Sequence, residues 1–346
     1  MTATVLTAAC HCKSINYTLT VPAECLPLKV HICHCGVCRR THGTPCIFHA
    51  PLPAGVAPQF NAPSGMDKLT PYSHGQSTGT RYFCSTCGCH IGDRGHDDGN
   101  WVISTAIFTE PNDHLWEMHS HIFTESSSDG GLSAMISHVN GRQLNVKNPD
   151  TPPITNTPET LLKGPKLNSK ELLAKCHCGG VSFSISRPRK EFISSPRSEG
   201  WVLPQDTNKW LALLDLCDDC RLVDGSNVVA WMFVPVDHIS PCPPEDLIIG
   251  SSTSYRSSEG VLRTFCGSCG STIFYSCADR PGIVDVAVGI LRAESVMIED
   301  WALWRTGRIG AAADGLKYDP GFSGALIEGF EMWGRERGMP EDFIVP

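Results

Sequence analysis

Short segments in which apolar and polar residues alternate recur along the chain. Residues 14–21 and 180–185 show this pattern most clearly, and residues 101–108 and 283–290 are further strand candidates. Alternation with a period of two is typical of β-strands that bury one face. Val228–Val234 is apolar throughout, which predicts a strand buried on both faces. The pattern therefore predicts a mainly β fold built from short strands.

Apolar residues with a helical period are rare. The best candidate for a helix is Gly324–Glu336, near the end of the chain. The 25 prolines and 32 glycines favour turns and short strands over long helices. We therefore expect little helix in either half of the protein.

Three cysteine motifs occur twice, in the same order. In the first half they are residues 10–12 (C-H-C), 33–39 (C-H-C-G-V-C-R) and 83–88 (F-C-S-T-C-G). In the second half they are residues 176–180 (C-H-C-G-G), 215–221 (D-L-C-D-D-C-R) and 265–270 (F-C-G-S-C-G). The interval from Cys38 to Cys84 equals the interval from Cys220 to Cys266. This agreement predicts an internal duplication in which both halves share one fold.

A polar, proline-rich stretch separates the two sets of motifs. Residues 148–158 carry four prolines and no hydrophobic period, which is typical of a linker. We therefore predict a first domain at residues 1–144, a linker at 145–170 and a second domain at 171–346.

Composition limits the classes of partner. The chain has 346 residues, of which 41% are hydrophobic and 18% charged, and a net charge of −8, which argues against nucleic acid. It contains no run of about 18 apolar residues that would span a membrane, and its first residues do not resemble a signal peptide. We expect a cytoplasmic protein that acts on a small molecule, with neither nucleic acid nor a membrane as partner. The sequence leaves its oligomeric state open.

The chain contains 18 cysteines. In a protein without a secretion signal, so many cysteines indicate metal binding rather than a disulfide framework. The outer motifs of each half supply four thiolates, which would close the tetrahedral coordination of a zinc ion and leave no position for a substrate. We therefore predict one structural zinc in each half, bound by Cys10, Cys12, Cys84 and Cys87 and by Cys176, Cys178, Cys266 and Cys269.

The inner motif of the first half offers only three thiolates, from Cys33, Cys35 and Cys38. The two cysteines of a C-x-C step in an extended chain lie on one face, and a C-x-x-C turn can bring two sulfurs to one metal. A zinc ion with three protein ligands keeps an open fourth position, which is typical of a catalytic site. The alternative is a second structural zinc whose fourth ligand comes from elsewhere, such as Cys46, Cys89 or His42.

The inner motif of the second half differs. Asp215 replaces Cys33 and Leu216 replaces His34, whereas Cys217 and Cys220 remain. A hard carboxylate suits a thiolate-rich site poorly, so we favour a decayed copy that holds no metal. A weaker site with one carboxylate and two thiolates is the alternative.

Three further residues beside the first inner motif are candidates for chemistry. His34 and His42 lie closest in sequence to the three cysteines and could move a proton. Arg39 directly follows Cys38 and could orient an anionic group. For each of them, a purely structural role is the alternative.

With these motifs the sequence resembles the glutathione-dependent formaldehyde-activating enzyme (GFA) family, which has an Mss4-like β-tent fold. The family pattern is C-x-C, then C-H-C-x-x-C-R, then F-C-x-x-C-G, and the resemblance covers nearly the whole chain as a tandem. It implies two Mss4-like zinc-binding β domains. It also implies that the outer cysteines hold structural zinc and that Cys33, Cys35 and Cys38 hold catalytic zinc, giving three zinc ions per chain.

The activity for which the family is named adds a thiol to a small aldehyde. The resemblance therefore implies a zinc-dependent carbon–sulfur lyase that acts on a small electrophilic carbonyl compound or on its thiol adduct, with glutathione as a possible thiol. Elimination, dehydration, isomerisation or retro-aldol cleavage of a small metabolite is the alternative chemistry. The alternative from another class is a zinc module that binds partners without catalysis.

Overall fold

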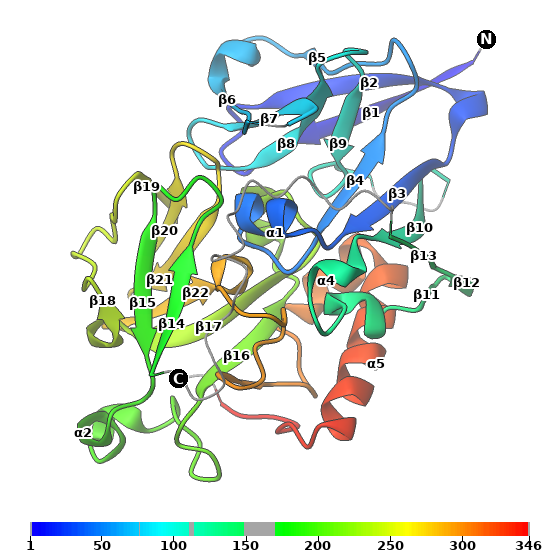
Figure 1. Ribbon diagram of the computed structural model, residues 1–346. Helices are drawn as coiled ribbons and strands as arrows, with labels where there is room; N and C mark the ends of the chain where they lie inside the picture. The colour runs from blue at the N-terminus through cyan, green and yellow to red at the C-terminus, as the bar shows by residue number, and fades with distance from the viewer. Residues whose placement is uncertain (1, 76, 111–113, 149–169, 345–346) are drawn as a thin grey trace.

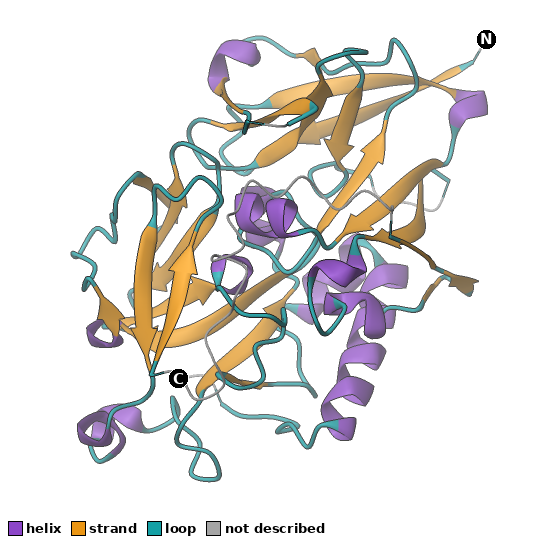
Figure 2. Cartoon of the chain, in the orientation of Figure 1, coloured by secondary structure: helices purple, strands orange, loops and turns teal. Residues whose placement is uncertain are grey.

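The computed structural model describes residues 2–75, 77–110, 114–148 and 170–344. It contains two similar halves, and each half is made of a large and a small sheet. Helix α1 lies where the two halves meet (Figures 1 and 2). The prediction of a mainly β fold with a tandem duplication is confirmed. Within these residues, no helix has both the length and the apolar character needed to cross a membrane.

The first half pairs its strands in the orders β1-β2-β5 and β13-β10-β3-β4-β9-β8-β7-β6. Most contacts are antiparallel, but β10 runs parallel to both β3 and β13. The strands are β1 (Ala3–Ala9), β2 (Asn16–Pro22), β3 (Leu28–Cys33), β4 (Ile47–Pro51), β5 (Gln59–Phe60), β6 (Leu69–Tyr72), β7 (Gly79–Cys84), β8 (His90–Gly95), β9 (Trp101–Ser104), β10 (Trp116–Ile122) and β13 (Asn145–Lys147), with a separate hairpin of β11 (His138–Val139) and β12 (Arg142–Gln143).

The second half repeats this topology, with the orders β14-β15-β18 and β23-β16-β17-β22-β21-β20-β19. Strand β23 again runs parallel to β16, as β10 does to β3. The strands are β14 (Glu171–Lys175), β15 (Ser182–Ser186), β16 (Trp210–Asp215), β17 (Val229–Pro235), β18 (Ile239–Ser240), β19 (Ser252–Ser258), β20 (Val261–Cys266), β21 (Thr272–Cys277), β22 (Ile283–Ala287) and β23 (Ala302–Trp304).

The predicted strands are present, and two of them are shorter than expected. Strand β17 is buried along its whole length, as its apolar sequence indicates. Strands β9 and β22 cover only the beginnings of 101–108 and 283–290. After β22 the chain turns into the short helix η8 (Val288–Ile290), where Gly289 donates a hydrogen bond to the carbonyl of Gly43. Contact with the other half therefore ends the strand.

The structure contains five α-helices, among the described residues. The predicted C-terminal helix is confirmed as α5 (Pro320–Glu336), and it begins at Asp319, whose side chain accepts a hydrogen bond from the backbone of Phe322. Two other helices start inside the inner cysteine motifs, where we expected a turn: α1 (Gly36–His42) and α3 (Asp218–Asp224). The remaining two are α2 (Lys190–Ile193) and α4 (Ala312–Tyr318).

Helix α5 joins the second half to the first. Phe322, Leu326, Phe330 and Trp333 form its buried apolar stripe. The ring of Phe322 packs against that of Phe48 in the first half, with 4.9 Å between centroids. A Cβ at Gly329 would lie 1.7 Å from the carbonyl oxygen of Met135, so only glycine allows this approach.

The predicted linker begins inside the first sheet. Residues 145–147 form β13 and pair with β10, so the chain leaves the first half after these residues. The central part of the predicted linker, residues 149–169, lies outside the described residues. The exact residue boundaries of the two domains therefore stay a prediction.

The two halves face each other through equivalent residues. The backbone N–H of His11 donates to the carbonyl of Leu222, and that of His177 donates to the carbonyl of Arg40. The imidazoles repeat this exchange, because His11 Nδ1 lies 2.7 Å from the hydroxyl of Tyr255 and His177 Nδ1 lies 2.6 Å from that of Tyr72. The contact therefore has the pattern of a two-fold dimer interface within one chain.

Glycines at the ends of α1 and α3 make this close contact possible. Gly43 and Gly225 both have a positive φ, of 81° and 70°. A Cβ at either position would lie 2.4 Å from a carbonyl oxygen of the other half, that of Thr272 or that of His90. The C-terminal ends of the two helices therefore lie in the interface.

Candidate metal centre

The outer cysteines of the first half form one compact cluster. Cys10 and Cys12 follow β1, whereas Cys84 ends β7 and Cys87 lies in the next turn. The Sγ atom of Cys12 lies 3.5 Å from that of Cys10 and 3.6 Å from that of Cys84. A disulfide would need about 2.05 Å. With zinc–sulfur bonds of about 2.3 Å, the edge of a tetrahedral site is about 3.8 Å, so these cysteines fit zinc.

The second half repeats the cluster with nearly the same dimensions. The Sγ atom of Cys178 lies 3.5 Å from those of both Cys176 and Cys266. In each half a backbone N–H donates to the first cysteine, from Ile15 to Cys10 and from Val181 to Cys176. The four Sγ atoms of each cluster all lie within 4.8 Å of one another. The four-cysteine sets predicted from the sequence are thus both brought together.

The inner cysteines of the first half also converge. Cys33 ends β3, Cys35 precedes α1 and Cys38 lies in its first turn, and their Sγ atoms lie within 4.8 Å of one another. The backbone N–H of Cys38 donates to the Sγ of Cys35 at 3.3 Å. In the described parts of the chain, no further His, Cys, Asp or Glu belongs to this cluster. The set therefore matches a zinc ion with three protein ligands.

The candidates for a fourth ligand lie elsewhere. Cys46 and Cys89 are both fully buried in the main hydrophobic core, which does not include the three inner cysteines. The ring of His42 stacks on that of His90, with 3.7 Å between centroids. Its Nδ1 lies 3.0 Å from the hydroxyl of Thr41 and 3.1 Å from the carbonyl oxygen of Cys38. None of these three residues belongs to the convergent group of Cys33, Cys35 and Cys38.

His34 and Arg39 belong to a buried hydrogen-bond network beside the inner cysteines. The Nε2 of His34 lies 2.9 Å from the Nδ1 of His121, and burial followed by the neighbouring His121 lowers the pKa of His34 well below its usual value. Arg39 donates from Nε to the carbonyl of His34 at 3.1 Å. Burial also lowers the pKa of Arg39. These contacts support a structural role for both residues, and their predicted catalytic roles remain untested.

Arg81 is a site residue that the sequence analysis missed. Its Nη2 donates to the Sγ of Cys38 at 3.6 Å, and its Nε lies 3.7 Å from the carboxylate of Asp93. Burial pushes the pKa of Arg81 down, but Asp93 and the sulfurs of Cys38 and Cys35 raise it overall. A cation here offsets the charge of three thiolates. The signal was available, because Arg263 stands at the same distance before Cys266 as Arg81 before Cys84.

His49 is a second residue with an unexpected position. It lies opposite His31 in the β3–β4 pair, on the sheet face that Cys33 also occupies. Both of its ring nitrogens are buried and have no hydrogen-bond partner among the described residues. A cavity of about 10 Å³, roughly the space of one water, is lined by its side chain together with His42, His90 and Asp93. Burial lowers the pKa of His49 to about 4, so the ring is neutral at pH 7.

The inner motif of the second half has a different arrangement. The carboxylate of Asp215 accepts a hydrogen bond from the backbone of Cys217 at 3.0 Å and lies 3.7 Å from the Sγ of Cys220. Arg263 donates to this Sγ at 3.4 Å, as Arg81 does to Cys38. These three potential ligands are not among the convergent groups found in the described residues.

A large cavity opens beside this second motif. Its volume is about 340 Å³, within the usual range for small-molecule sites. Cys217, Cys220 and Asp215 line it together with three arginines and an aromatic wall, formed by Arg263, Arg280, Arg305, Trp231, Phe233 and Tyr275. The thiolate-rich cluster of the first half is buried, and the more open cavity belongs to the half that lacks it.

Comparison with known proteins agrees with this geometry. The family described as glutathione-dependent formaldehyde-activating enzyme matches residues 5–126 and 205–306, which together make up more than half of the chain. The chain belongs to the GFA family. Each matched segment contains an inner motif and its large sheet, apart from β13 in the first half, so this is a tandem GFA protein with two Mss4-like regions. Both family segments end before α4 and α5, which are therefore additions to the matched region.

Other comparisons add little. No curated protein matches the chain. Among solved structures, a Rhodobacter sphaeroides protein is 20% identical and has a TM-score of 0.24. The match covers 32% of this chain and 99% of that protein. The family assignment therefore rests on the family match and on the cysteine clusters.

Proposed function

We propose that this GFA protein is a cytoplasmic zinc-dependent lyase whose reaction takes place at Cys33, Cys35 and Cys38. The observation that carries the proposal is the convergence of three thiols with no fourth protein ligand among the described residues. Zinc bound there would supply one open position for a thiolate sulfur or a carbonyl oxygen. We expect three zinc ions per chain, two of them structural.

The substrate that fits is the thiol adduct of a small carbonyl compound, and glutathione is the thiol suggested by the family name. In the lyase direction, the carbon–sulfur bond breaks and the sulfur keeps the electron pair. The adduct's hydroxyl group loses its proton as the carbonyl forms. The three cysteines are only 2–5% exposed, which favours a small carbonyl compound such as an aldehyde.

Two side chains beside the cysteines suit this reaction. His49 is neutral, and neither of its ring nitrogens has a hydrogen-bond partner in the described parts of the chain, so it can accept the hydroxyl proton. Arg81 keeps a positive charge next to Cys38 and opposes the build-up of negative charge at the sulfurs. His34, His42 and Arg39, the residues predicted from the sequence, then hold α1 and the cysteines in place.

A second candidate site is the cavity at Cys217 and Cys220. Its volume of about 340 Å³ and its lining by Arg263 are the observations in its favour. A reaction in this cavity would take place in the second half and would not involve a three-thiolate metal site.

The test measures the interconversion of formaldehyde, glutathione and their adduct by exchange NMR at equilibrium. We expect the wild-type protein to accelerate the exchange, Cys35→Ala to abolish the acceleration, and Cys217→Ala to leave most of it. Zinc content and circular dichroism check that both variants are folded. Loss of exchange in Cys217→Ala, with zinc intact at the first site, would move the active centre to the second half. No acceleration by zinc-loaded wild type with several small aldehydes would favour a non-catalytic zinc module.

A further inference from the structure

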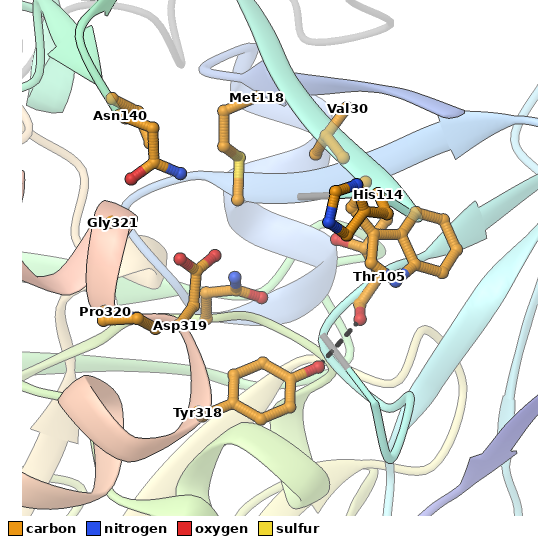
Figure 3. A pocket seen from close by; sticks show the side chains of 12 residues that line it. Val30, Thr105, His114, Met118, Asn140, Tyr318, Asp319, Pro320 and Gly321 are labelled. Atoms are coloured by element: carbon orange, nitrogen blue, oxygen red, sulfur yellow. Dashed lines mark hydrogen bonds between the residues drawn. The ribbon is translucent and has the colours of Figure 1, made fainter. Parts of the chain in front are cut away.

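Two cavities of similar size have linings of different chemistry. One, of about 330 Å³, lies at the junction of the two halves, where Met118 and Asn140 of the first half and Asp319 of the second point toward one space (Figure 3). No cysteine is among the described residues that line it. The other, of about 340 Å³, lies in the second half and is lined by Cys217 and Cys220. Of these two cavities, the one in the second half therefore places thiols, which are strong nucleophiles, beside a space for a small molecule.

Cys217 and Cys220 form a pair of neighbouring thiols. Cys217 directly precedes α3, and Cys220 lies in the first turn of that helix, so the two side chains share one face. The thiols are hydrogen bonded to each other, and both cysteines are free. A C-x-x-C spacing allows two thiols to close into a disulfide.

The pair lacks the third thiolate that its counterpart in the first half has. Asp215 occupies the position of Cys33, and Asp215, Cys217 and Cys220 are not among the convergent ligand groups of the described residues. A carboxylate suits a soft, thiolate-rich metal site poorly. The two thiols of the second half are therefore left for covalent chemistry.

The two thiols differ in access and in acidity. Cys217 is half-buried, whereas Cys220 is only 3% exposed. The hydrogen bond with Cys220 lowers the pKa of Cys217, and the same hydrogen bond together with burial raises the pKa of Cys220 well above its usual value. The attacking species in thiol chemistry is the thiolate. Cys217 is therefore the residue that attacks first, and Cys220 is the residue that follows.

Two charged side chains contact Cys220. Its Sγ lies 3.7 Å from Oδ2 of Asp215, and Nη1 of Arg263 donates to the same sulfur at 3.4 Å. Burial raises the pKa of Asp215, so this carboxylate takes up a proton more readily than an exposed one. A cation beside a sulfur stabilises its thiolate. Asp215 and Arg263 can therefore remove the proton of Cys220 and hold the resulting charge.

We propose that Cys217 and Cys220 reduce a low-molecular-weight disulfide bound in this cavity. The Cys217 thiolate attacks one sulfur of the substrate, the S–S bond breaks, and the other sulfur leaves as a thiolate with the electron pair. The Cys220 thiol gives its proton to Asp215 and attacks the Sγ of Cys217, which releases the second substrate thiolate. The substrate gains two electrons, the two cysteines become one disulfide, and two molecules of a monothiol restore the cysteines by the reverse steps.

The lining limits the size of the substrate more than its charge. An aromatic wall of Trp231, Phe233 and Tyr275 suits apolar groups. The charged residues of the lining balance, because it contains three arginines and three aspartates: Arg263, Arg280, Arg305, Asp215, Asp219 and Asp285. A small neutral disulfide is therefore the suitable probe. The reaction does not depend on the lyase proposed at the inner cysteines of the first half, because none of them lines this cavity.

Bis(2-hydroxyethyl) disulfide is such a probe. Zinc-loaded wild type should release two molecules of 2-mercaptoethanol per chain and form a disulfide between Cys217 and Cys220, which peptide mapping by mass spectrometry identifies. Cys217→Ser should react at least about tenfold more slowly. Cys220→Ser should release one molecule per chain and keep the other half of the probe as a mixed disulfide on Cys217. Asp215→Asn should leave the first release at least as fast and slow the second about tenfold.

Cys242→Ser is the matched control, because Cys242 is an exposed thiol of the same half that does not line the cavity. It should react at the wild-type rate. Should Cys217→Ser fail to fold, the mixed disulfide trapped in Cys220→Ser still identifies the attacking residue. The proposal is wrong if wild type forms no disulfide between Cys217 and Cys220, or if Cys217→Ser reacts as fast as wild type. A fourth zinc ion in wild type, bound by this pair, would also overturn it.

Discussion

The two inner sites occupy the same place in two equivalent sheets, yet nearly every side chain around them differs. The strand registers show the equivalence, because His31 pairs with His49 in β3–β4 and Leu213 pairs with Trp231 in β16–β17. Across the other strands, Arg81 pairs with Asp93, and Arg263 pairs with Tyr275. Cys33 corresponds to Asp215 in the same alignment.

Apart from the change at Cys33, each of these replacements exchanges a titratable side chain in the first half for an apolar or aromatic one in the second half. The first half surrounds its cysteines with histidines and a carboxylate, whereas the second half has leucine, tryptophan and tyrosine at the same positions. Among these paired strand positions, only Arg81 and Arg263 carry the same residue in both halves. A three-cysteine cluster with titratable neighbours in the first half thus corresponds to an aromatic cavity with three arginines in the second half.

The outer clusters do not differ in this way, since both halves keep all four cysteines and the spacings within the C-x-C and C-x-x-C motifs. Each outer cluster ties β1 or β14 to the distant end of β7 or β20. The comparison indicates that the outer clusters maintain the fold, which leaves each inner site free to differ. The predictions below test this separation, from the largest expected effect to the smallest.

The largest effect should come from the outer clusters. A structural zinc site contributes apparent binding energy of about 10–16 kcal/mol to folding, more than the whole stability of a typical domain. We therefore expect Cys84→Ser and Cys266→Ser to give insoluble protein, whereas Cys38→Ser folds and loses activity. Soluble yield and elemental zinc content measure the outcome. Aggregation of Cys38→Ser to the same extent would show that the inner site is structural as well.

Exchanging one ligand between the inner sites should change the zinc content. Cys33→Asp gives the first half the residue of the second, and we expect its zinc to fall from three to two per chain because the hard carboxylate weakens a thiolate site. The reverse change, Asp215→Cys, completes a second three-thiolate set and should raise the content to four. Inductively coupled plasma spectrometry gives both counts. Three zinc ions retained in Cys33→Asp would contradict the assignment of the metal to the inner cysteines.

Part of the protein's acid sensitivity should come from His90 in the first half. Burial lowers the pKa of His90 to about 3, whereas an unfolded histidine has about 6.5. Below pH 6.5 the unfolded chain therefore binds a proton that the folded chain does not, and stability falls as the pH decreases toward 3. At pH 5 the loss is about 2 kcal/mol.

The second half has Thr272 at the position of His90. In urea unfolding at pH 7 and pH 5, His90→Thr should show a smaller difference between the two values than wild type, by about 2 kcal/mol. The exposed His96 provides the control, because His96→Thr should keep the wild-type difference. An unchanged difference in His90→Thr would mean that other groups cause the acid sensitivity.

The smallest effect concerns the symmetric contact between the halves. Tyr72→Phe and Tyr255→Phe each remove one hydrogen bond to a histidine of the other half, His177 or His11. Each substitution should lower the free energy of unfolding by about 1 kcal/mol, and the loss should be the same in both variants. Strongly unequal losses, measured by urea unfolding, would show that the two contacts are not energetically equivalent.

The sequence by itself determined the repeat, the β class and the cysteine clusters. Sulfur ligands are chemically specific, and the spacing of C-x-C and C-x-x-C motifs restricts which cysteines can share a metal ion. The C-terminal helix was predictable for a related reason, since the apolar stripe of α5 is a local pattern. These features depend on residue type and short-range spacing.

Only the tertiary structure decided which other residues lie at the two inner sites. Arg81 is 43 residues from Cys38 and contacts its sulfur, and the pairing of β3 with β4 places His49 on the sheet face of Cys33. Helices α1 and α3 are too short to show a period, and the sequence predicted turns there. The large cavity beside Cys217 and the one between the halves form from strands and helices far apart in the chain, so no local pattern announces them. Non-local packing creates such spaces, because burying the shared core fixes where side chains leave room.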